Sequence, residues 1–248
     1  MNSLAILTYH SLDTSGSVVS VAPQAFADQM STLAEAGFCG VSLREALSHR
    51  EAHAAWPERC VALTFDDGFA NFYEEAMPAL VRHSFTATVF VISGYVGGRN
   101  DWAPPPARLG LREMLTWPQI AEMSAAGIEI GAHTRNHKDL RQLSTAEAQE
   151  EIGGSRVEIE DRLGQPVESF AYPFGYVSPT SLEIVQREFR AACTTVLRRA
   201  SAEPLHELPR VDMYYLRAAR QLSQLLEARL DRYLTVRRLA RMARATLT

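Results

Sequence analysis

Short apolar or β-rich runs alternate with helical patterns along most of this chain of 248 residues. The strand-like runs fall at about 4–9, 61–65, 86–92, 128–131, 168–172, 191–196 and 207–211. Helical patterns lie between most of them, at 23–36, 70–83, 117–126, 145–163 and 178–189. Such alternation is typical of βα units with parallel strands. A chain with 46% hydrophobic residues and this length can bury one large core. The pattern therefore predicts βα units with about seven parallel strands, and a single α/β barrel fits this length.

Several helix starts carry their own signals. Pro23 and Pro118 stand just inside helical patterns, where a missing backbone N–H costs nothing. Ser144 followed three residues later by Glu147 is typical of a capping box. These signals support the helix boundaries drawn from the periodicity.

Two adjacent carboxylates, Asp66 and Asp67, end the apolar run 61–65 and are followed by Gly68. A buried strand looks like this when its C-terminal end opens into a site. Neighbouring side chains diverge at a strand end, so one acid can bind a metal while the other handles a proton. The alternative is an ordinary Asp-Asp-Gly surface turn.

Two histidines four residues apart, His133 and His137, follow a second apolar run that ends at Gly131. On one turn of helix such positions share a face, so both imidazoles can approach one cation. Two imidazoles and one carboxylate suit zinc, and also cobalt or nickel. Solvent-exposed helix histidines are the alternative.

Three segments together resemble the polysaccharide deacetylases, the NodB-homology group of carbohydrate esterase family 4. They are Thr64–Gly68, His133–His137 and Phe170–Gly175, and the resemblance covers about residues 4–212 in the right order. It implies a distorted (β/α) barrel that removes acetyl groups from N-acetylated sugars. In such barrels the site forms at the C-terminal ends of the strands.

The chain departs from the family pattern at two places. At the position of Ala171, many members carry an arginine that holds the catalytic aspartate. A late Leu-x-His motif, common in the family, is not evident near His206. However, the N-terminal segment ending in Tyr9-His10 resembles the permuted exopolysaccharide (poly-N-acetylglucosamine) deacetylases, whose acid histidine comes from the first strand. The resemblance thus implies His10 as the acid; a satisfied core pair with Tyr9 is the alternative. We expect Arg210 to replace the missing arginine, with Asp212 as a further orienting group.

The resemblance also implies a division of roles within the site. Asp67, His133 and His137 would hold a divalent metal, most simply zinc, and Asp66 would act as base on the attacking water. The oxyanion would be held by the metal and by the backbone N–H of Phe174, after the turn at Pro173. Tyr172, next to that turn, belongs to the same candidate substrate-binding segment.

A long insertion, residues 93–116, follows a strand-like run and contains Trp102. Loops of this length within a compact domain are usually functional or disordered. We expect the insertion at the mouth of the site. There Trp102 either stacks on a sugar ring or anchors its own loop.

The last segment, residues 217–248, differs from the predicted barrel domain of residues 1–216. It holds eight arginines against two acidic residues, with leucines at a helical spacing. We expect either helices packed on the barrel or a docking segment for an anionic membrane or a partner protein.

Net charge, cysteine content and the N-terminal sequence narrow the possible partners and the cellular compartment. A net charge of −4 gives no electrostatic case for nucleic acid. Cys39, Cys60 and Cys193 lack zinc-site spacing and are expected to be reduced, small apolar side chains. A start without a basic region and long apolar core predicts a cytoplasmic protein, at most peripheral to a membrane.

Three functional hypotheses remain open. The first is a metal-dependent deacetylase of an N-acetylated amino sugar, in a polymer, an oligosaccharide, or a lipid- or nucleotide-linked intermediate. The second is an O-acetyl esterase or a deacetylase of a small metabolite. The third is an inactive barrel that binds glycan or a partner, motivated by Ala171 and the missing late histidine. The sequence does not decide the oligomeric state.

Overall fold

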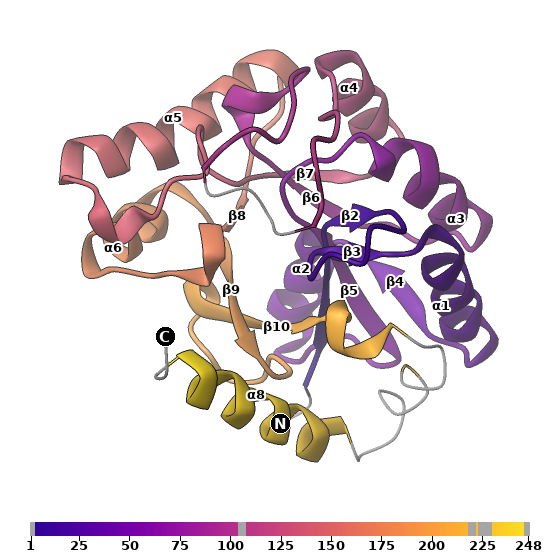
Figure 1. The fold of residues 1–248 in the computed structure, drawn as a ribbon. Coiled ribbons are helices and arrows are strands. Elements are labelled where there is room, and N and C mark those ends of the chain that lie inside the picture. The colour runs from indigo at the N-terminus through magenta and orange to yellow at the C-terminus, as the bar shows by residue number, and fades with distance from the viewer. Residues whose placement is uncertain (1–2, 104–107, 218–221, 223–229, 246–248) are drawn as a thin grey trace.

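A ring of seven parallel strands forms the centre of the molecule (Figure 1). The computed structural model describes residues 3–103, 108–217, 222 and 230–245, without the side chains of 240–245. In ring order the strands are β1 (Ala5–Tyr9), β10 (Leu208–Asp212), β9 (Ala191–Leu197), β8 (Ser169–Ala171), β7 (Glu129–Ala132), β6 (Thr88–Val91) and β5 (Cys60–Phe65). Pairing of β1 with both β10 and β5 closes the ring. The predicted barrel of about seven strands is confirmed.

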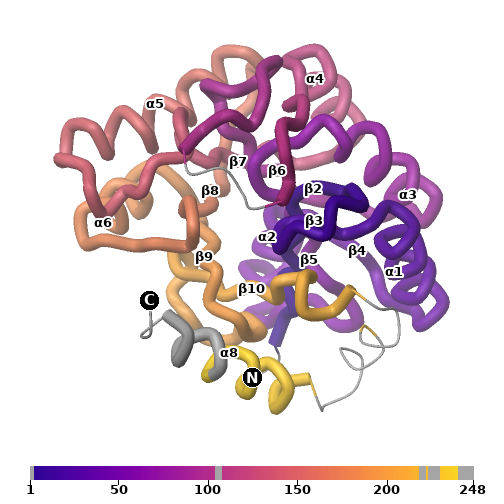
Figure 2. The backbone as a smooth tube through the Cα atoms, viewed as in Figure 1, coloured from indigo at the N-terminus to yellow at the C-terminus, as the bar shows by residue number. Residues whose placement is uncertain are grey.

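The chain travels once around this ring, so its first and last strands become neighbours. In Figure 2 the colour passes from indigo β1 around to orange β10, and these two strands pair through Leu7 with Val211 and Thr8 with Asp212. All ladder pairs in the ring are parallel. The C-terminal ends of all seven strands therefore meet at one end of the barrel, as the site requires.

Helices cover the outside of the ring and agree with the predicted ranges. They are α1 (Pro23–Glu35), a π-helical turn (Phe72–Ala76) leading into α3 (Met77–Arg82), α4 (Trp117–Ala125), α5 (Thr145–Leu163) and α6 (Pro179–Glu188). Pro23 and Pro118 stand in the first turns of α1 and α4. The capping box predicted at Ser144 is present, with Glu147 as its second member.

Strand residues divide by the period of two into an outer and an inner set. On β5, Val61, Leu63 and Phe65 belong to the large apolar cluster shared with the surrounding helices. Ala62, between them, belongs instead to a second cluster inside the barrel. If this alternation continues beyond the end of β5, the side chain of Asp66 points into the barrel lumen, as that of Ala62 does.

One helix that the sequence did not predict, α2 (Leu43–His53), closes the N-terminal end of the barrel. Its Leu43, Ala46 and Leu47 join the inner cluster together with lumen residues such as Ile6 and Leu208. In Figure 1 it lies behind the ring of strands. The lumen is thus sealed at one end, so access to a site is left at the opposite end.

Short strands were also missed. β4 (Cys39–Val41) pairs with the first half of β5. β6 pairs with the second half of β5, along the same edge of that strand. β2 (Ser11–Leu12) and β3 (Ser20–Val21) form a separate parallel pair after β1. These segments of two or three residues form no apolar run long enough to be recognised in the sequence.

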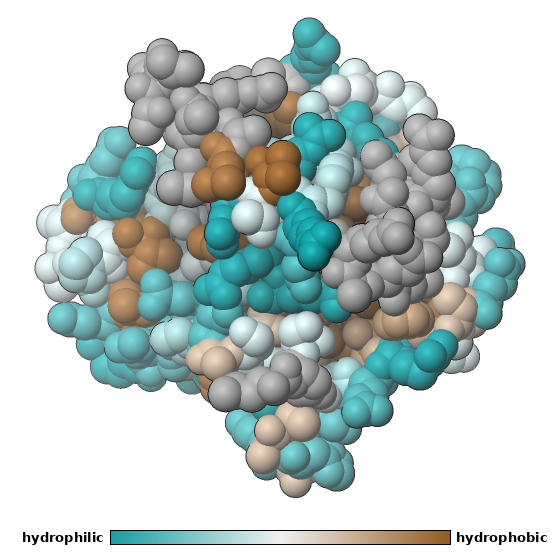
Figure 3. Space-filling view, turned by 90° about the horizontal axis from the view of Figure 1, so that it is seen from below, coloured by the Kyte–Doolittle hydropathy of each residue, from teal (hydrophilic) through white to brown (hydrophobic). Residues whose placement is uncertain are grey.

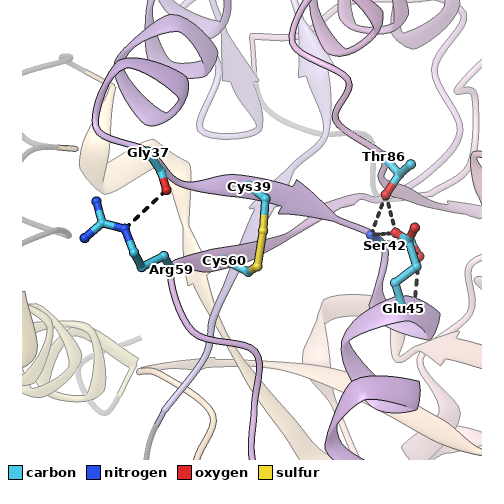
Figure 4. The surroundings of a disulfide bond; sticks show 7 residues. All are labelled: Gly37, Cys39, Ser42, Glu45, Arg59, Cys60 and Thr86. Carbon is cyan, nitrogen blue, oxygen red and sulfur yellow. Dashed lines mark hydrogen bonds between the residues drawn. A yellow bond between two sulfur atoms is a disulfide. The ribbon is translucent and has the colours of Figure 1, made fainter.

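A disulfide joins Cys39 to Cys60, which corrects the expectation that these cysteines are reduced (Figure 4). The two residues are register partners on β4 and β5, with their Cα atoms 4.6 Å apart. Disulfides are rare in reducing compartments, so the pairing gives no support to the compartment expected from the sequence. Cys193 is a buried free thiol in the barrel lumen, as expected.

The described part of the C-terminal segment packs on the barrel. In α8 (Leu230–Ala245), Leu230 and Leu234 are buried in the main apolar cluster, while Val236 and Leu239 are exposed. Seen from the side of α8, hydrophilic and hydrophobic residues are interspersed (Figure 3). Residues 218–221 and 223–229 lie outside the described residues. The domain boundary after residue 216 remains a prediction. Contact of the segment 217–248 with a membrane or a partner protein remains a prediction as well.

Candidate metal centre and active site

Asp66 and Asp67 leave the end of β5 in different directions, because the backbone turns between them. The N–H of Asp66 still donates to the carbonyl of Tyr9 at 3.0 Å, so Asp66 continues the strand and points into the lumen. Asp67 and Gly68 then adopt φ of 72° and 84°, in the left-handed region. The two neighbouring carboxylates consequently meet different partners.

Asp67, His133 and His137 converge on one point. The Oδ1 atom of Asp67 lies 3.4 Å from Nε2 of His133 and 3.5 Å from Nε2 of His137. One ligand atom from each residue lies within 4.8 Å of the other two, and all three residues are buried. Ligands about 2.0–2.1 Å from a tetrahedral zinc ion are about 3.3–3.4 Å apart, so these separations fit such an ion.

The hydrogen bond to His133 supports the same interpretation. Nδ1 of His133 lies 2.7 Å from the carbonyl oxygen of Ala171, which can only accept, so Nδ1 donates this bond and Nε2 is the nitrogen that faces Asp67. Burial lowers the pKa of His137 to about 4, so its imidazole is neutral near pH 7, as a metal ligand must be.

The two histidines do not share a helix, contrary to the sequence-based expectation. Residues 133–139 form an irregular loop between β7 and a 3-10 turn (Leu140–Gln142). Thr134 and His137 have φ of 66° and 55°, and the N–H of His137 donates to the Thr134 hydroxyl at 3.0 Å. The Thr134 hydroxyl thus stabilises a turn, and the imidazoles converge because the chain folds back.

Asp66 forms a buried ion pair with Arg210. The guanidinium donates to both carboxylate oxygens, at 2.7 Å and 2.6 Å, and its Nε donates to the Thr194 carbonyl at 2.9 Å. Both side chains are nearly inaccessible, with 3% and 1% exposed. Burial alone would raise the pKa of Asp66, but the Arg210 charge outweighs it and holds that pKa well below its ordinary range.

His10 stands beside Asp66 at the open end of the lumen. It follows β1 directly, and its Nε2 lies 3.8 Å from Oδ2 of Asp66. Its side chain is 21% exposed, in contrast to the buried Asp66. The histidine expected to act as acid therefore lies between the buried carboxylate and solvent.

The third motif contributes one side chain at the site and one in the core. Phe174, in the 3-10 turn Pro173–Gly175, has φ of 59° and packs its ring edge against His137 at 4.6 Å between centroids. Pro173 is buried under this turn. Tyr172 faces the helices instead, is fully buried and packs on Phe170. In this structure Tyr172 has no exposed surface for a substrate.

Trp102 anchors the insertion next to the candidate metal ligands. It is 3% exposed and packs against Phe69, Tyr95 and the ring of His137. This geometry agrees with the anchoring alternative rather than with stacking on a sugar. The three prolines at 104–106 lie outside the described residues.

Asp212 ends β10, and its carboxylate accepts the N–H of Tyr214 in the following turn. Its negative charge contributes to raising the pKa of the buried Arg210.

A groove of about 540 Å³ adjoins the candidate centre on the side of Phe174. Its lining includes Lys138, Asp139, Arg141 and Tyr176. The Arg141 guanidinium lies 3.5 Å from the centroid of the Tyr176 ring, which is one of the exposed aromatic side chains. The sequence interpretation missed these residues, although each follows His137 or Phe174 within four positions.

No helix among the described residues is long and apolar enough to cross a membrane.

Comparison with known proteins places this chain in a family. Residues 53–188, just over half of the chain, match the family model of the polysaccharide deacetylases. A Bacillus subtilis protein named as a polysaccharide deacetylase is 29% identical over 74% of this chain and 61% of its own length. The poly-beta-1,6-N-acetyl-D-glucosamine N-deacetylase of Staphylococcus aureus is 25% identical over 68% of this chain and 58% of its own. The chain thus spans about three fifths of these relatives.

The fold has a similar solved counterpart. The structure of a Streptococcus pyogenes deacetylase in complex with acetate has a TM-score of 0.77 and 28% sequence identity. The match covers 90% of this chain and 97% of that one.

Proposed function

The chain belongs to the polysaccharide deacetylase family, and from this premise we propose that it is a metal-dependent hydrolase of N-acetylated amino sugars. The observation that carries the proposal is the convergence of Asp67, His133 and His137 beside the Asp66–Arg210 pair. A binding module would not need three buried ligand groups next to a buried, ionised carboxylate.

Asp67, His133 and His137 would hold the metal. A divalent ion held by these residues would lower the pKa of bound water toward about 7 and would polarise the acetyl oxygen. Zinc suits the donor set best, and cobalt or nickel also fit. Three protein ligands would leave further coordination positions for water and substrate, as catalytic zinc sites require.

Asp66 would accept the proton of the attacking water. Arg210 keeps this carboxylate ionised despite its burial, so it is ready to act as a base at neutral pH. The arginine supplies from β10 the charge that many family members supply from the position of Ala171. Ala171 therefore no longer argues for an inactive barrel.

His10 would protonate the departing nitrogen. An amine is a poor leaving group unless it gains a proton, and His10 is the partly exposed imidazole nearest to Asp66 in the described site. The backbone N–H of Phe174 would help to hold the oxyanion, because its left-handed turn faces His137.

The groove beside Phe174 supports a saccharide larger than one ring. Its exposed Tyr176 and the planar polar groups of Asp139 and Arg141 are the kinds of side chain that bind sugar hydroxyls and ring faces. An oligosaccharide or polymer of N-acetylhexosamine is therefore the substrate class that we propose. Lipid-linked oligosaccharides share this chemistry.

The test is acetate release from N-acetylated mono-, oligo- and lipid-linked sugars, with O-acetylated sugars in parallel. Protein stripped of metal and reloaded with zinc, cobalt or nickel is used throughout. We expect Asp67→Asn and His133→Ala to abolish metal binding and acetate release. His53→Ala, an exposed histidine on α2, is the matched control and should retain both. Full turnover by either ligand variant, or release from O-acetyl sugars alone, would falsify the proposal.

A further inference from the structure

The loop that carries the two histidines is fastened to α5 by one buried residue, Glu151. Its side chain is 3% exposed and lies in the second turn of the helix. One carboxylate oxygen accepts the backbone N–H of Asn136 at 2.8 Å, and the other accepts the Asn136 side-chain amide at 2.8 Å. The backbone carbonyl of Glu151 also accepts the N–H of Arg135, at 3.1 Å. Two consecutive loop residues thus make three hydrogen bonds to a single helix residue.

This loop needs external support because of its backbone conformation. Thr134 and His137, on either side of this contact, both have positive φ, which is unfavourable for residues with a Cβ atom. Such conformations persist when surrounding contacts over-determine them. His133 is held by strand pairing, since its N–H donates to Val91 at 2.9 Å. His137 lies three residues beyond Thr134, and its immediate neighbour Asn136 carries the contact to α5.

We propose that Glu151 is a positioning residue for metal binding. It fixes the backbone at Asn136, so that Nε2 of His137 faces Oδ1 of Asp67 before any metal arrives. The inference rests on the proposed metal site, but Glu151 acts only through the loop and touches none of the ligand side chains in the described contacts.

A carboxylate suits this position better than an amide. The groups that face Glu151 are all donors: the N–H and the side-chain amide of Asn136, and the ammonium of Lys138 at 3.6 Å. Glutamine would turn an N–H donor toward one of these donors and leave it without an acceptor. Replacement of Glu151 by glutamine therefore removes one acceptor oxygen and the negative charge from this contact at constant size.

The adjacent helix residue provides a matched control. Glu150 forms an ion pair with the side chain of Arg135, so it also carries a negative charge next to this loop. It is 67% exposed and its ion pair involves no loop backbone group. Exposed pairs of this kind contribute little. Glu150→Gln removes the same charge one residue away without releasing Asn136.

The first measurement is the affinity of the metal-stripped full chain for zinc, by competition with a chromophoric chelator. Substitutions of groups that orient metal ligands cost about 10–100-fold in affinity. We expect Glu151→Gln to bind zinc about 10-fold more weakly than the wild type, and Glu150→Gln to stay within about twofold. Asn136→Ala, which loses only the side-chain half of the contact, should fall between them.

The second measurement is amide hydrogen exchange of the metal-free proteins. Peptides that cover residues 133–138 should exchange faster in Glu151→Gln than in the wild type, while peptides of β5 and β10 should be unchanged. A general loss of stability would instead accelerate exchange throughout the barrel.

The outcomes separate the two proposals. A wild-type protein that binds no zinc contradicts the proposed metal site, and the exchange data then decide the role of Glu151 alone. Equal zinc affinity and equal loop exchange in folded Glu151→Gln and wild type would overturn the inference. If Glu151→Gln does not fold, Asn136→Ala decides, and wild-type affinity with wild-type loop exchange in that variant overturns it.

Discussion

Two carboxylates are buried inside the same barrel, one toward each end, and their partners differ in kind. Asp66, at the C-terminal end, is paired with the Arg210 guanidinium and lies 3.8 Å from the partly exposed His10. Glu129, at the N-terminal end of β7, is equally buried, with 2% exposed. Burial therefore does not separate the two.

The donors around Glu129 are neutral and belong to the framework. Its two oxygens accept the hydroxyls of Thr88 and Ser169, each at 2.6 Å, and the backbone N–H of Arg44 at 2.8 Å. These groups come from β6, β8 and the first turn of α2. Glu129 thus connects the helix that closes the barrel to its strands.

The comparison teaches that the partners and the surroundings identify a functional carboxylate, whereas depth does not. Glu129 is surrounded by donors on the sealed side of the lumen. Asp66 is kept ionised by a cation and faces an imidazole on the open side. Four substitutions test this distinction.

The largest effect is expected for Asp66→Asn. Loss of a general base lowers the rate by about 10²–10⁴-fold, and we expect about 10³-fold here while zinc affinity is retained. Steady-state acetate release and zinc titration measure the two quantities. Glu129→Gln, assayed at the same concentration of folded protein, is the control. Less than a tenfold decrease for Asp66→Asn would mean that another group takes the proton.

Arg210→Met should affect both stability and pH dependence. It leaves Asp66 buried without its cation, which costs about 3 kcal/mol in the free energy of unfolding. Arg210 lowers the pKa of Asp66, so without it burial raises that pKa and the acidic limb of kcat/KM moves to higher pH. Arg210→Lys should shift the limb less. An unmoved acidic limb in Arg210→Met would separate Arg210 from the ionisation of Asp66.

Glu129→Gln should reduce stability and leave catalysis unchanged. The amide nitrogen would meet donors, and leaving buried polar groups unsatisfied costs about 1–3 kcal/mol. Chemical denaturation measures the free energy of unfolding, and acetate release by the folded fraction measures turnover. A lowered kcat with normal stability would give the sealed end a part in the reaction.

The smallest effect is expected for Ser42→Ala. Ser42 is the N-cap of α2 in a capping box with Glu45, and loss of such a cap costs about 1 kcal/mol. Thr116→Ala removes the equivalent cap of α4 and serves as the comparison. Both should change the denaturation midpoint by similar amounts without changing turnover. A much larger loss for Ser42→Ala would indicate that closure of the lumen depends on this cap.

Most of the fold could be predicted because its strands, buried on both faces, stand out as short apolar runs, and its outer helices bury one face and so show a helical period. The predicted runs correspond to the seven ring strands, and the predicted helices to α1, α3, α4, α5 and α6. α2 was missed because its apolar contact is limited to Leu43, Ala46 and Leu47 on an otherwise polar segment. The disulfide was missed because only strand register brings Cys39 opposite Cys60.

At the site, the local motifs and the family resemblance indicated the main side chains, including the distant Arg210, but not the loop conformation or the role of Glu151. The Asp-Asp and His-x-x-x-His segments indicated the residues that converge, but the predicted helix for the histidines is a loop. Glu151 gave no signal, since its partner Asn136 lies 15 positions earlier in the chain. Hydrogen bonds between residues this far apart in the chain produce no periodic pattern in the sequence.

The sequence by itself determined the alternation of strands and helices and the side chains available at the strand ends, because both depend on neighbours in the chain. The tertiary structure alone decided which of those side chains meet. Closure of the ring brings β10 next to β1 and so carries Arg210 to Asp66, 144 positions away. That contact holds the carboxylate in its ionised form, which no local property of either segment could establish.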